Sequence, residues 1–308
     1  MNRTGTRGMQ LALGTAGISG VAVFLNSYGV KTFEDSATYT TAKNAVAALV
    51  LIGVVGALSA SSSGRVLSRP TGPRQWAALG LVGVVGGSLP FLLFFEGLSR
   101  ASSAQAAFLH KTLVVWVALL AVPLLAERVG PLQWGAIGLL VAGQASLAGG
   151  VAAPLHMPWG SGELMVLAAT LCWAVETVLV KRLLGGLTSW TVALARMVLG
   201  SLVLVGWAAA RGQAAGVVRL DAEQLGWVLL TGLLLAGYVG TWFAALARAQ
   251  AVDVTAVLVV GALVTAVLSA VVDGTALVPQ LAGLTMLVAG GALVLVGTRR
   301  VPGAVRVT

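Results

Sequence analysis

The sequence is poor in charge and in cysteine. Only 9% of its 308 residues are Asp, Glu, Lys or Arg, against about 25% in ordinary globular chains. So few charges cannot build a water-soluble surface, and disorder is excluded because disordered segments combine high charge with low hydrophobicity. The single cysteine, Cys172, excludes an intrachain disulfide and a cysteine-based metal site. The chain also lacks Walker and HExxH motifs, so we expect no cofactor and no metal.

Apolar residues dominate instead. They make up 58% of the chain, and the mean hydropathy is +0.95. The apolar runs are about 20 residues long, which is the length of a membrane-spanning helix and about twice that of a membrane β-strand. The sequence therefore predicts an all-α, polytopic membrane protein with ten transmembrane helices. The predicted spans are Met9–Val30, Ala37–Ser59, Gln75–Gly97, Ala101–Leu125, Leu132–Gly149, Gly162–Leu184, Thr188–Ala210, Gln224–Ala247, Asp253–Val272 and Pro279–Thr298.

Basic residues are divided unevenly between the loops. With the N-terminus inside, the inner bases are Arg3, Arg7, Arg65, Arg69, Arg74, Arg128, Lys181, Arg182, Arg248, Arg299, Arg300 and Arg306, and the outer ones are Lys31, Arg100, Arg211 and Arg219. Because cytoplasmic loops carry the excess of Lys and Arg, we expect both termini in the cytoplasm and the chain in a bacterial-type inner membrane. The bases are scattered rather than clustered, so the net charge of +9 does not indicate nucleic-acid binding.

The chain contains an internal repeat. Three segments recur in the same order at offsets of 153, 148 and 147 residues, which is stronger than any single match between apolar segments. The pairs are KNAVAALVLIG (Lys43–Gly53) with RMVLGSLVLVG (Arg196–Gly206), LSRASSAQAAFL (Leu98–Leu109) with LARAQAVDVTAVL (Leu246–Leu258), and LLVAG (Leu139–Gly143) with MLVAG (Met286–Gly290).

The repeat divides the chain into two five-helix halves. We place the first at residues 1–149, an extracytoplasmic linker at 150–161, and the second half with a cytoplasmic tail at 162–308. Five is odd, so the second half enters the membrane from the opposite side. Inverted repeats of this kind are typical of secondary transporters, in which the substrate site lies near the midplane between the halves.

The run Ser99–Gly143 resembles the EamA repeat of the drug/metabolite transporter superfamily. It has a small-residue-rich fourth span, the pair Glu127–Arg128, and a glycine-rich fifth span; in the second half Asp273 falls near Glu127's position but out of register. The resemblance implies a ten-helix secondary transporter, and similarity to the superfamily's YddG-type aromatic amino acid exporters implies amino acid export by alternating access. His110 and Lys111 depart from the repeat, which often has apolar residues and a proline there.

Charged residues within the predicted spans mark the candidate site. Charges in a bilayer cost about 2.5–3.5 kcal/mol each and usually face a cavity or a partner. Lys43, Lys111 and Arg196 lie in spans, with Glu96 and Glu176 as anionic counterparts. This excess of positive charge favours a carboxylate, phosphate or zwitterion as substrate.

The depth of each charge suggests its role. Lys43 and its repeat mate Arg196 lie at similar depths in opposite leaflets, as matching gate residues would, and Glu176 lies at the depth of Arg196. We therefore predict a Glu176–Arg196 pair at the inner gate. Lys111 lies about ten residues from either end of its span, where it needs a partner: Glu96, Glu176, Asn44 or the substrate.

Aromatic and titratable residues complete the candidate cavity. Trp173 accompanies Glu176 on the sixth span, and Tyr238 accompanies Trp242 on the eighth, as a planar, partly polar ligand requires. His110 can titrate near neutral pH, so protons are a candidate coupling ion. The predicted partners are therefore a small-molecule substrate, the lipid bilayer and protons.

Other interpretations of the same residues stay open. The buried charges also fit a purely structural ion-pair network, and Lys43 and Arg196 taken singly fit snorkelling toward headgroups. The substrate can instead be a drug, an organic anion or a sugar phosphate. A channel or scaffold is a further alternative, and a remote one is an intramembrane hydrolase, suggested by the short match Gly17-Ile18-Ser19-Gly20 with His110 as base.

Overall fold

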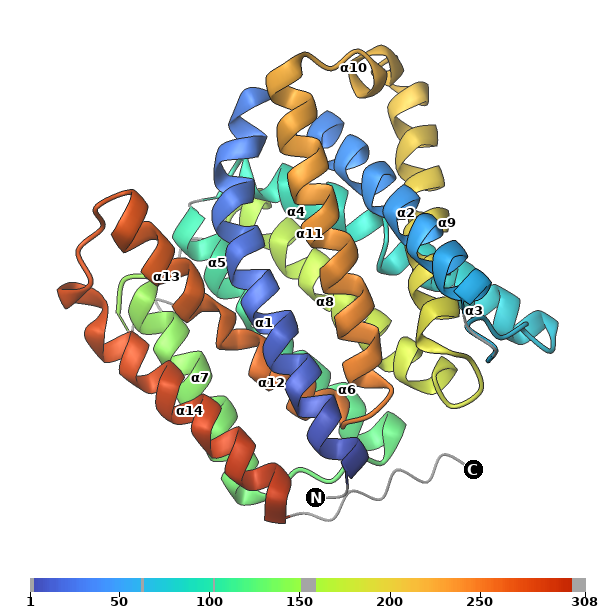
Figure 1. The fold of residues 1–308 in the computed structure, drawn as a ribbon. Coiled ribbons are helices and arrows are strands. Elements are labelled where there is room, and N and C mark those ends of the chain that lie inside the picture. The colour runs from blue at the N-terminus through green and yellow to red at the C-terminus, as the bar shows by residue number, and fades with distance from the viewer. Residues whose placement is uncertain (1–2, 62–63, 102, 151–158, 301–308) are drawn as a thin grey trace.

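The computed structural model describes residues 3–61, 64–101, 103–150 and 159–300, and all the secondary-structure elements in these ranges are helices (Figure 1). The all-α prediction is confirmed. Most of the predicted linker 150–161, together with the end of the tail at 301–308, lies outside the described residues.

The helices follow the predicted spans closely. In the first half they are α1 (Arg3–Gly29), α2 (Ser36–Ser61), α3 (Pro73–Val85), α4 (Leu89–Leu98), α5 (Ser103–Lys111), α6 (Leu113–Leu125) and α7 (Pro131–Leu147). In the second half they are α8 (Ser161–Leu183), α9 (Ser189–Ala210), the short α10 (Ala214–Val218), α11 (Ala222–Leu246), α12 (Ala251–Val259), α13 (Gly261–Val272) and α14 (Leu281–Arg300). Val30–Thr32 and Val278–Gln280 form 3₁₀ turns.

Nine helical segments of the described chain are long and apolar enough to cross a membrane. The tenth predicted span is α7, which has 17 residues and lies alongside α14 over its length (Figure 1). The protein is therefore a multi-pass membrane protein. We call the end of the bundle where α1 begins the N-terminal end, and the opposite end the far end. The first half enters from the N-terminal end and the second half from the far end.

Three spans that were predicted as continuous are interrupted. The third breaks between α3 and α4 at Gly86, the fourth between α5 and α6 at Thr112, and the ninth between α12 and α13 at Val260. The first break has a local cause, because two glycines disfavour the helix and Pro90 is placed in the first turn of α4. Interrupted helices inside a membrane expose backbone groups only where protein or a cavity satisfies them.

The two halves are packed into each other rather than side by side. Helix α1 packs along α11, α2 packs against α9 and α11, and α4 and α6 pack against α8 (Figure 1). Small residues allow the closest crossings: a Cβ on Gly200 of α9 would lie 2.6 Å from backbone atoms of Gly87. Such close backbone approach is the usual basis of helix association in membranes.

The Gly200–Gly87 crossing can be tested with a matched pair of variants. Gly200→Ala should lower the free energy of unfolding by about 1–3 kcal/mol, because the backbone of Gly87 cannot yield to the added methyl group. Gly206→Ala lies on the same helix with nothing within 4 Å, so it should leave stability unchanged or slightly raised. Thermal unfolding of the purified protein in detergent measures both. Equal effects of the two variants would contradict the crossing.

Candidate transport site

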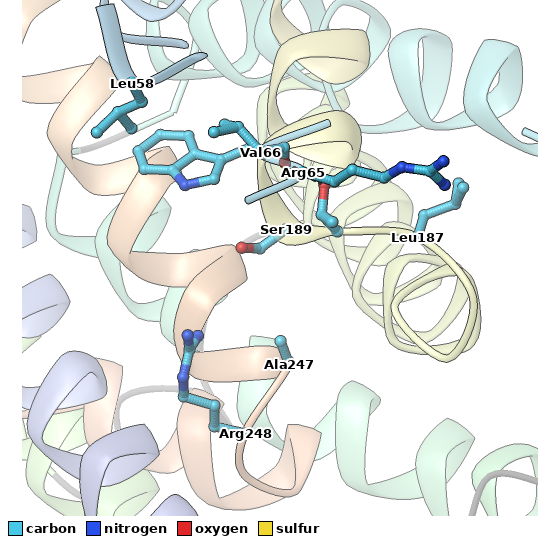
Figure 2. A pocket seen from close by; sticks show the side chains of 9 residues that line it. Leu58, Arg65, Val66, Leu187, Ser189, Ala247 and Arg248 are labelled. Atoms are coloured by element: carbon cyan, nitrogen blue, oxygen red, sulfur yellow. Dashed lines mark hydrogen bonds between the residues drawn. The ribbon is translucent and has the colours of Figure 1, made fainter. Parts of the chain in front are cut away.

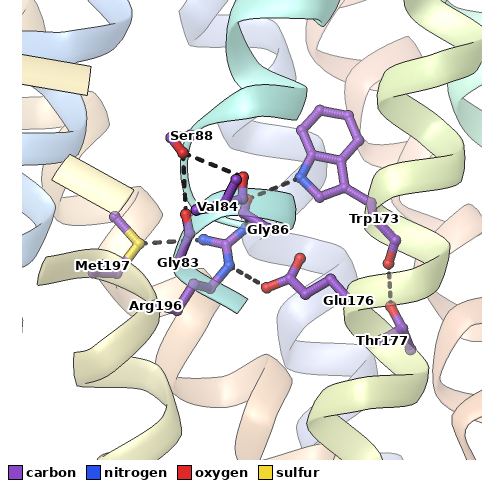
Figure 3. Close-up of polar contacts among 9 residues, drawn as sticks. All are labelled: Gly83, Val84, Gly86, Ser88, Trp173, Glu176, Thr177, Arg196 and Met197. Carbon is purple, nitrogen blue, oxygen red and sulfur yellow. Dashed lines mark hydrogen bonds and ion pairs between the residues drawn. The ribbon is translucent and has the colours of Figure 1, made fainter. Parts of the chain in front are cut away.

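The break between α3 and α4 anchors a buried polar network. Arg196 of α9 donates from Nε to Glu176 Oε1 of α8 at 2.5 Å and from Nη2 to the Gly86 carbonyl at 2.9 Å (Figure 3). The indole N–H of Trp173 donates to the same carbonyl at 3.2 Å. Both charged side chains are about 5% exposed. The predicted Glu176–Arg196 contact is thus confirmed, while its role as a gate stays a prediction.

Glycine is required at position 86 by this network. A Cβ there would lie 2.1 Å from the carboxyl carbon of Glu176. The missing side chain lets Glu176 reach Arg196, and the missing helical bond leaves the Gly86 carbonyl free to accept from two donors. One break therefore supplies both the space and the acceptor.

An aromatic cluster lies beside this network. The Trp173 ring is 4.9 Å from the His110 ring, 5.5 Å from Phe91 and 5.7 Å from Phe94, measured between centroids. Phe94 also lies 5.3 Å from His110. The His110 Nδ1 atom is buried and has no hydrogen-bond partner among the described residues. Together α4, α5 and α8 thus form an aromatic surface that contains one unsatisfied nitrogen.

Lys111 follows His110 at the last residue of α5, just before the Thr112 break. It is partly buried, and within the described chain it makes no hydrogen bond or ion pair. On α11, Tyr238 and Trp242 stack at 6.0 Å with an interplanar angle of 11°. The predicted cavity residues His110 and Trp173 are therefore in contact, and Tyr238 and Trp242, which stack on each other, belong to the same core cluster as Trp173.

Of two further candidates, Glu96 differs from the sequence expectation, whereas the assignment of Asn44 to the cavity stays a prediction. Glu96 was expected as a deep counter-charge, but it lies half-exposed near the end of α4 and pairs with Arg100 one turn later. This corrects its assignment as a partner for Lys111. Asn44 is fully buried on α2, where its Nδ2 donates to the Thr40 carbonyl and its Oδ1 lacks a partner.

Lys43 forms a second polar cluster toward the far end. Its ammonium donates to Asn26 Oδ1 of α1 at 2.9 Å. The Tyr39 hydroxyl lies 2.7 Å from the same oxygen and 3.0 Å from Thr231 Oγ1 of α11. The ammonium also lies over the rings of Tyr39 and Phe95, at 4.9 and 5.1 Å. Only 4% of Lys43 is exposed.

At the N-terminal end, sequence reasoning missed a group of buried polar contacts, several of which join the two halves. Glu127, 8% exposed, accepts from the backbone N–H groups of Ala251 and Val252 at the start of α12, at 2.6 and 3.1 Å. Burial raises the pKa of Glu127, while the two amide bonds and nearby Lys181 oppose that rise. The Lys181 ammonium donates to the carbonyls of Leu246 and Ala249.

A further hydrogen bond between the halves belongs to this group. Gln133 of α7 donates to Asp253 of α12 at 2.7 Å, and both side chains are buried. We call Glu127, Gln133, Lys181 and Asp253 the N-terminal closure. Its only sequence signal was the Glu127–Arg128 pair of the family resemblance.

A shallow cavity of about 580 Å³ opens at the same end (Figure 2). Arg65 and Arg248 contribute basic groups from the two halves, and the Arg248 side chain points toward Ser189 in Figure 2. Its lining residues are Leu58, Arg65, Val66, Leu187, Thr188, Ser189, Trp190, Ala247 and Arg248. Neither Arg196 nor Lys111 is among the lining residues, so this cavity does not include the charges that were predicted as the site.

The fold and these buried polar groups define a multi-pass membrane protein built from two repeats. A model described as the EamA-like transporter family matches residues 6–148 and again residues 160–297. The chain belongs to this family, within the drug/metabolite superfamily. Its members are transporters rather than enzymes, so the hydrolase interpretation is wrong.

A solved crystal structure of a protein shares the fold with a TM-score of 0.76. The two chains are 16% identical, and the match covers 96% of this chain and 99% of the other. At this identity the likeness concerns the fold alone. No protein of curated function matches the sequence.

The Glu176–Arg196 pair can be measured by a double-mutant cycle. Glu176→Gln and Arg196→Gln should each cost about 3–5 kcal/mol of stability, because each leaves an uncompensated buried charge. The double variant should cost clearly less than the sum. The exposed Glu96–Arg100 pair is the matched control, with a coupling below about 1 kcal/mol. Additive losses at Glu176 and Arg196, measured by thermal unfolding, would exclude a coupled pair.

Proposed function

We propose that the protein is a secondary transporter that exports amino acids, aromatic ones above all, by alternating access. The observation that carries this proposal is Lys111, a charge inside the membrane that has no partner in the described chain. Lys111 directly follows His110, whose ring contacts Phe94 and Trp173 and whose Nδ1 has no hydrogen-bond partner among the described residues. A substrate carboxylate would supply the missing counter-charge.

The aromatic cluster supports an aromatic side chain on the substrate. Trp173, Phe94 and His110 present rings that can pack against a planar apolar side chain. His110 Nδ1 offers a hydrogen-bonding atom at the same place. An aromatic amino acid combines one carboxylate with one flat ring, which is the pair of groups this surface is able to bind.

The two ends of the bundle support alternating access. The positive-inside distribution assigns the N-terminal end to the cytoplasm. There Glu127 caps α12 and is buried. Near the corresponding position of the second half, Asp273 is exposed and accepts instead from the Tyr28 hydroxyl. The protein would thus be closed toward the cytoplasm in this structure, and in the opposite state the N-terminal closure would open.

Counterflow in proteoliposomes tests this function. We expect saturable exchange of aromatic amino acids, with weaker exchange of other organic anions and none of organic cations. Lys111→Ala should lower exchange by about 30-fold or more, because the carboxylate loses its charged partner. Lys31→Ala is the matched control, since Lys31 is exposed at the far end and should not affect exchange.

Three outcomes would contradict the proposal. Transport confined to cations and indifferent to Lys111→Ala would exclude the carboxylate. Flux without saturation or exchange would indicate a channel. Equal losses in Lys111→Ala and Lys31→Ala would assign the effect to general damage.

A further inference from the structure

The two halves place a base at matched positions but give it different partners. Lys43 and Arg196 each open the repeated motif of their span, and each is 4% exposed. Each donates to the first span of its own half: Lys43 to Asn26 at 2.9 Å, and Arg196 to Glu176 at 2.5 Å. The acceptor is a neutral amide in the first half and a carboxylate in the second.

Asn26 cannot compensate the charge of Lys43. Its Nδ2 donates to the Ala22 carbonyl at 2.6 Å, which fixes the orientation of the amide. Its Oδ1 is approached by both Lys43 and the Tyr39 hydroxyl. One shared acceptor therefore serves an ammonium with three N–H groups, and the remaining surface of the ammonium faces the rings of Tyr39 and Phe95.

Among the described residues, no carboxylate forms an ion pair with Lys43. The ion pairs within 4.0 Å are Arg100–Glu96 and Arg196–Glu176, and neither includes Lys43. Asp35, which lies just before α2, accepts from the backbone N–H groups of Ala37 and Thr38. Lys43 thus has no carboxylate partner in its transmembrane position, whereas Arg196 is paired with the carboxylate of Glu176.

We propose that Lys43 is an anion-binding station on the far-end half of the transport path. The ligand is a small anionic group: the carboxylate of the transported compound or an inorganic anion such as chloride. Phe95 separates the station from the central cluster, since its ring lies 5.1 Å from the Lys43 ammonium and 5.5 Å from Phe94, which contacts His110. A carboxylate released from Lys111 would meet Lys43 after passing this Phe94–Phe95 pair.

This proposal deepens the proposed function, because it adds a second position to the same path. It also explains why the two halves differ. Glu176 occupies Arg196, so that base does not compete for an anion. Asn26 leaves Lys43 available, so that of these two matched bases only Lys43 can attract an anion.

The station is tested by anion binding in lipid nanodiscs, in a Lys111→Ala chain that lacks the central cation. The probes are chloride alone, L-phenylalanine and L-phenylalaninamide, in a buffer whose other anion is a bulky sulfonate. The apparent affinity is taken from the thermal midpoint at increasing probe concentration. Asn26→Asp installs the missing carboxylate and should weaken anion binding by about 30-fold or more. Asn26→Ser changes the same residue without adding charge and should stay within about threefold.

The probes distinguish the source of the anion. Stabilisation by chloride alone assigns an inorganic anion, whereas stabilisation by phenylalanine and not by its amide assigns the carboxylate of the transported compound. The station would be overturned if no anion stabilised the Lys111→Ala chain that retains Asn26. It would also be overturned if Asn26→Asp and Asn26→Ser weakened anion binding equally. If Asn26→Asp does not fold, Lys43→Gln in the same Lys111→Ala chain must weaken chloride or phenylalanine binding by the same factor.

The station and the proposed function fail in different measurements. Counterflow of the unchanged protein tests the proposed transport, and the nanodisc titration tests anion binding at the station. If the unchanged protein exchanges amino acids but Asn26→Asp does not weaken anion binding, the station is wrong and the proposed function stands. If anion binding is weakened by Asn26→Asp but the unchanged protein exchanges no amino acids, the proposed function is wrong and the station stands.

Discussion

The structure depends on the cost of placing an unpaired charge inside a membrane. That cost is about 2.5–3.5 kcal/mol per charge on insertion scales, so a fold with marginal stability can carry few uncompensated ones. Most buried charged groups here are compensated: Arg196 by Glu176, Glu127 by two backbone amides, and Lys181 by two carbonyls. Lys43 and Lys111 are the exceptions among the described residues. The proposed function depends on these two lysines, because neither has a carboxylate partner in the described chain.

Interrupted helices make this arrangement possible. A continuous third span would use the Gly86 carbonyl internally and would place a side chain where Glu176 reaches Arg196. The break frees that carbonyl for Arg196 and Trp173, and it aligns α4 so that Phe91 and Phe94 meet Trp173. The breaks at Thr112 and Val260 fall in the same way within spans that carry Lys111 and Asp253. The buried polar contacts thus depend on the helix breaks, because a break supplies the free backbone groups and the space that the side chains use.

Much of the fold followed from the sequence because membrane spans are encoded locally. Each apolar run predicts its own helix, and the repeat of five spans predicts that the second half enters the membrane from the opposite side to the first. The Glu176–Arg196 contact was also predictable, since equal depth in the bilayer restricts which residues can meet. The Gly86 break had a signal in the two glycines followed by Pro90, which the continuous hydropathy of the run outweighed.

Other features of the site depend on tertiary contacts that hydropathy does not record. Glu96 was counted as a deep charge because it falls within a predicted span, whereas it is half-exposed and pairs with Arg100 one helical turn away. The N-terminal closure joins residues more than a hundred positions apart, Gln133 to Asp253 among them. That Lys43 contacts a neutral amide while Arg196 contacts a carboxylate depends on which residues of the neighbouring helices face each base. A single sequence shows which charges fall within apolar spans, but neither how deeply they are buried nor which of them already have a partner.

The most direct measurement is an experimental structure of the protein in lipid with a bound aromatic amino acid. The account predicts that the ligand carboxylate lies about 2.7–3.2 Å from the Lys111 ammonium, with the ring against Trp173 and Phe94. A ligand whose amino group points at Lys111, or a Lys111 already paired with a protein carboxylate beneath an unrelated ligand position, would contradict it.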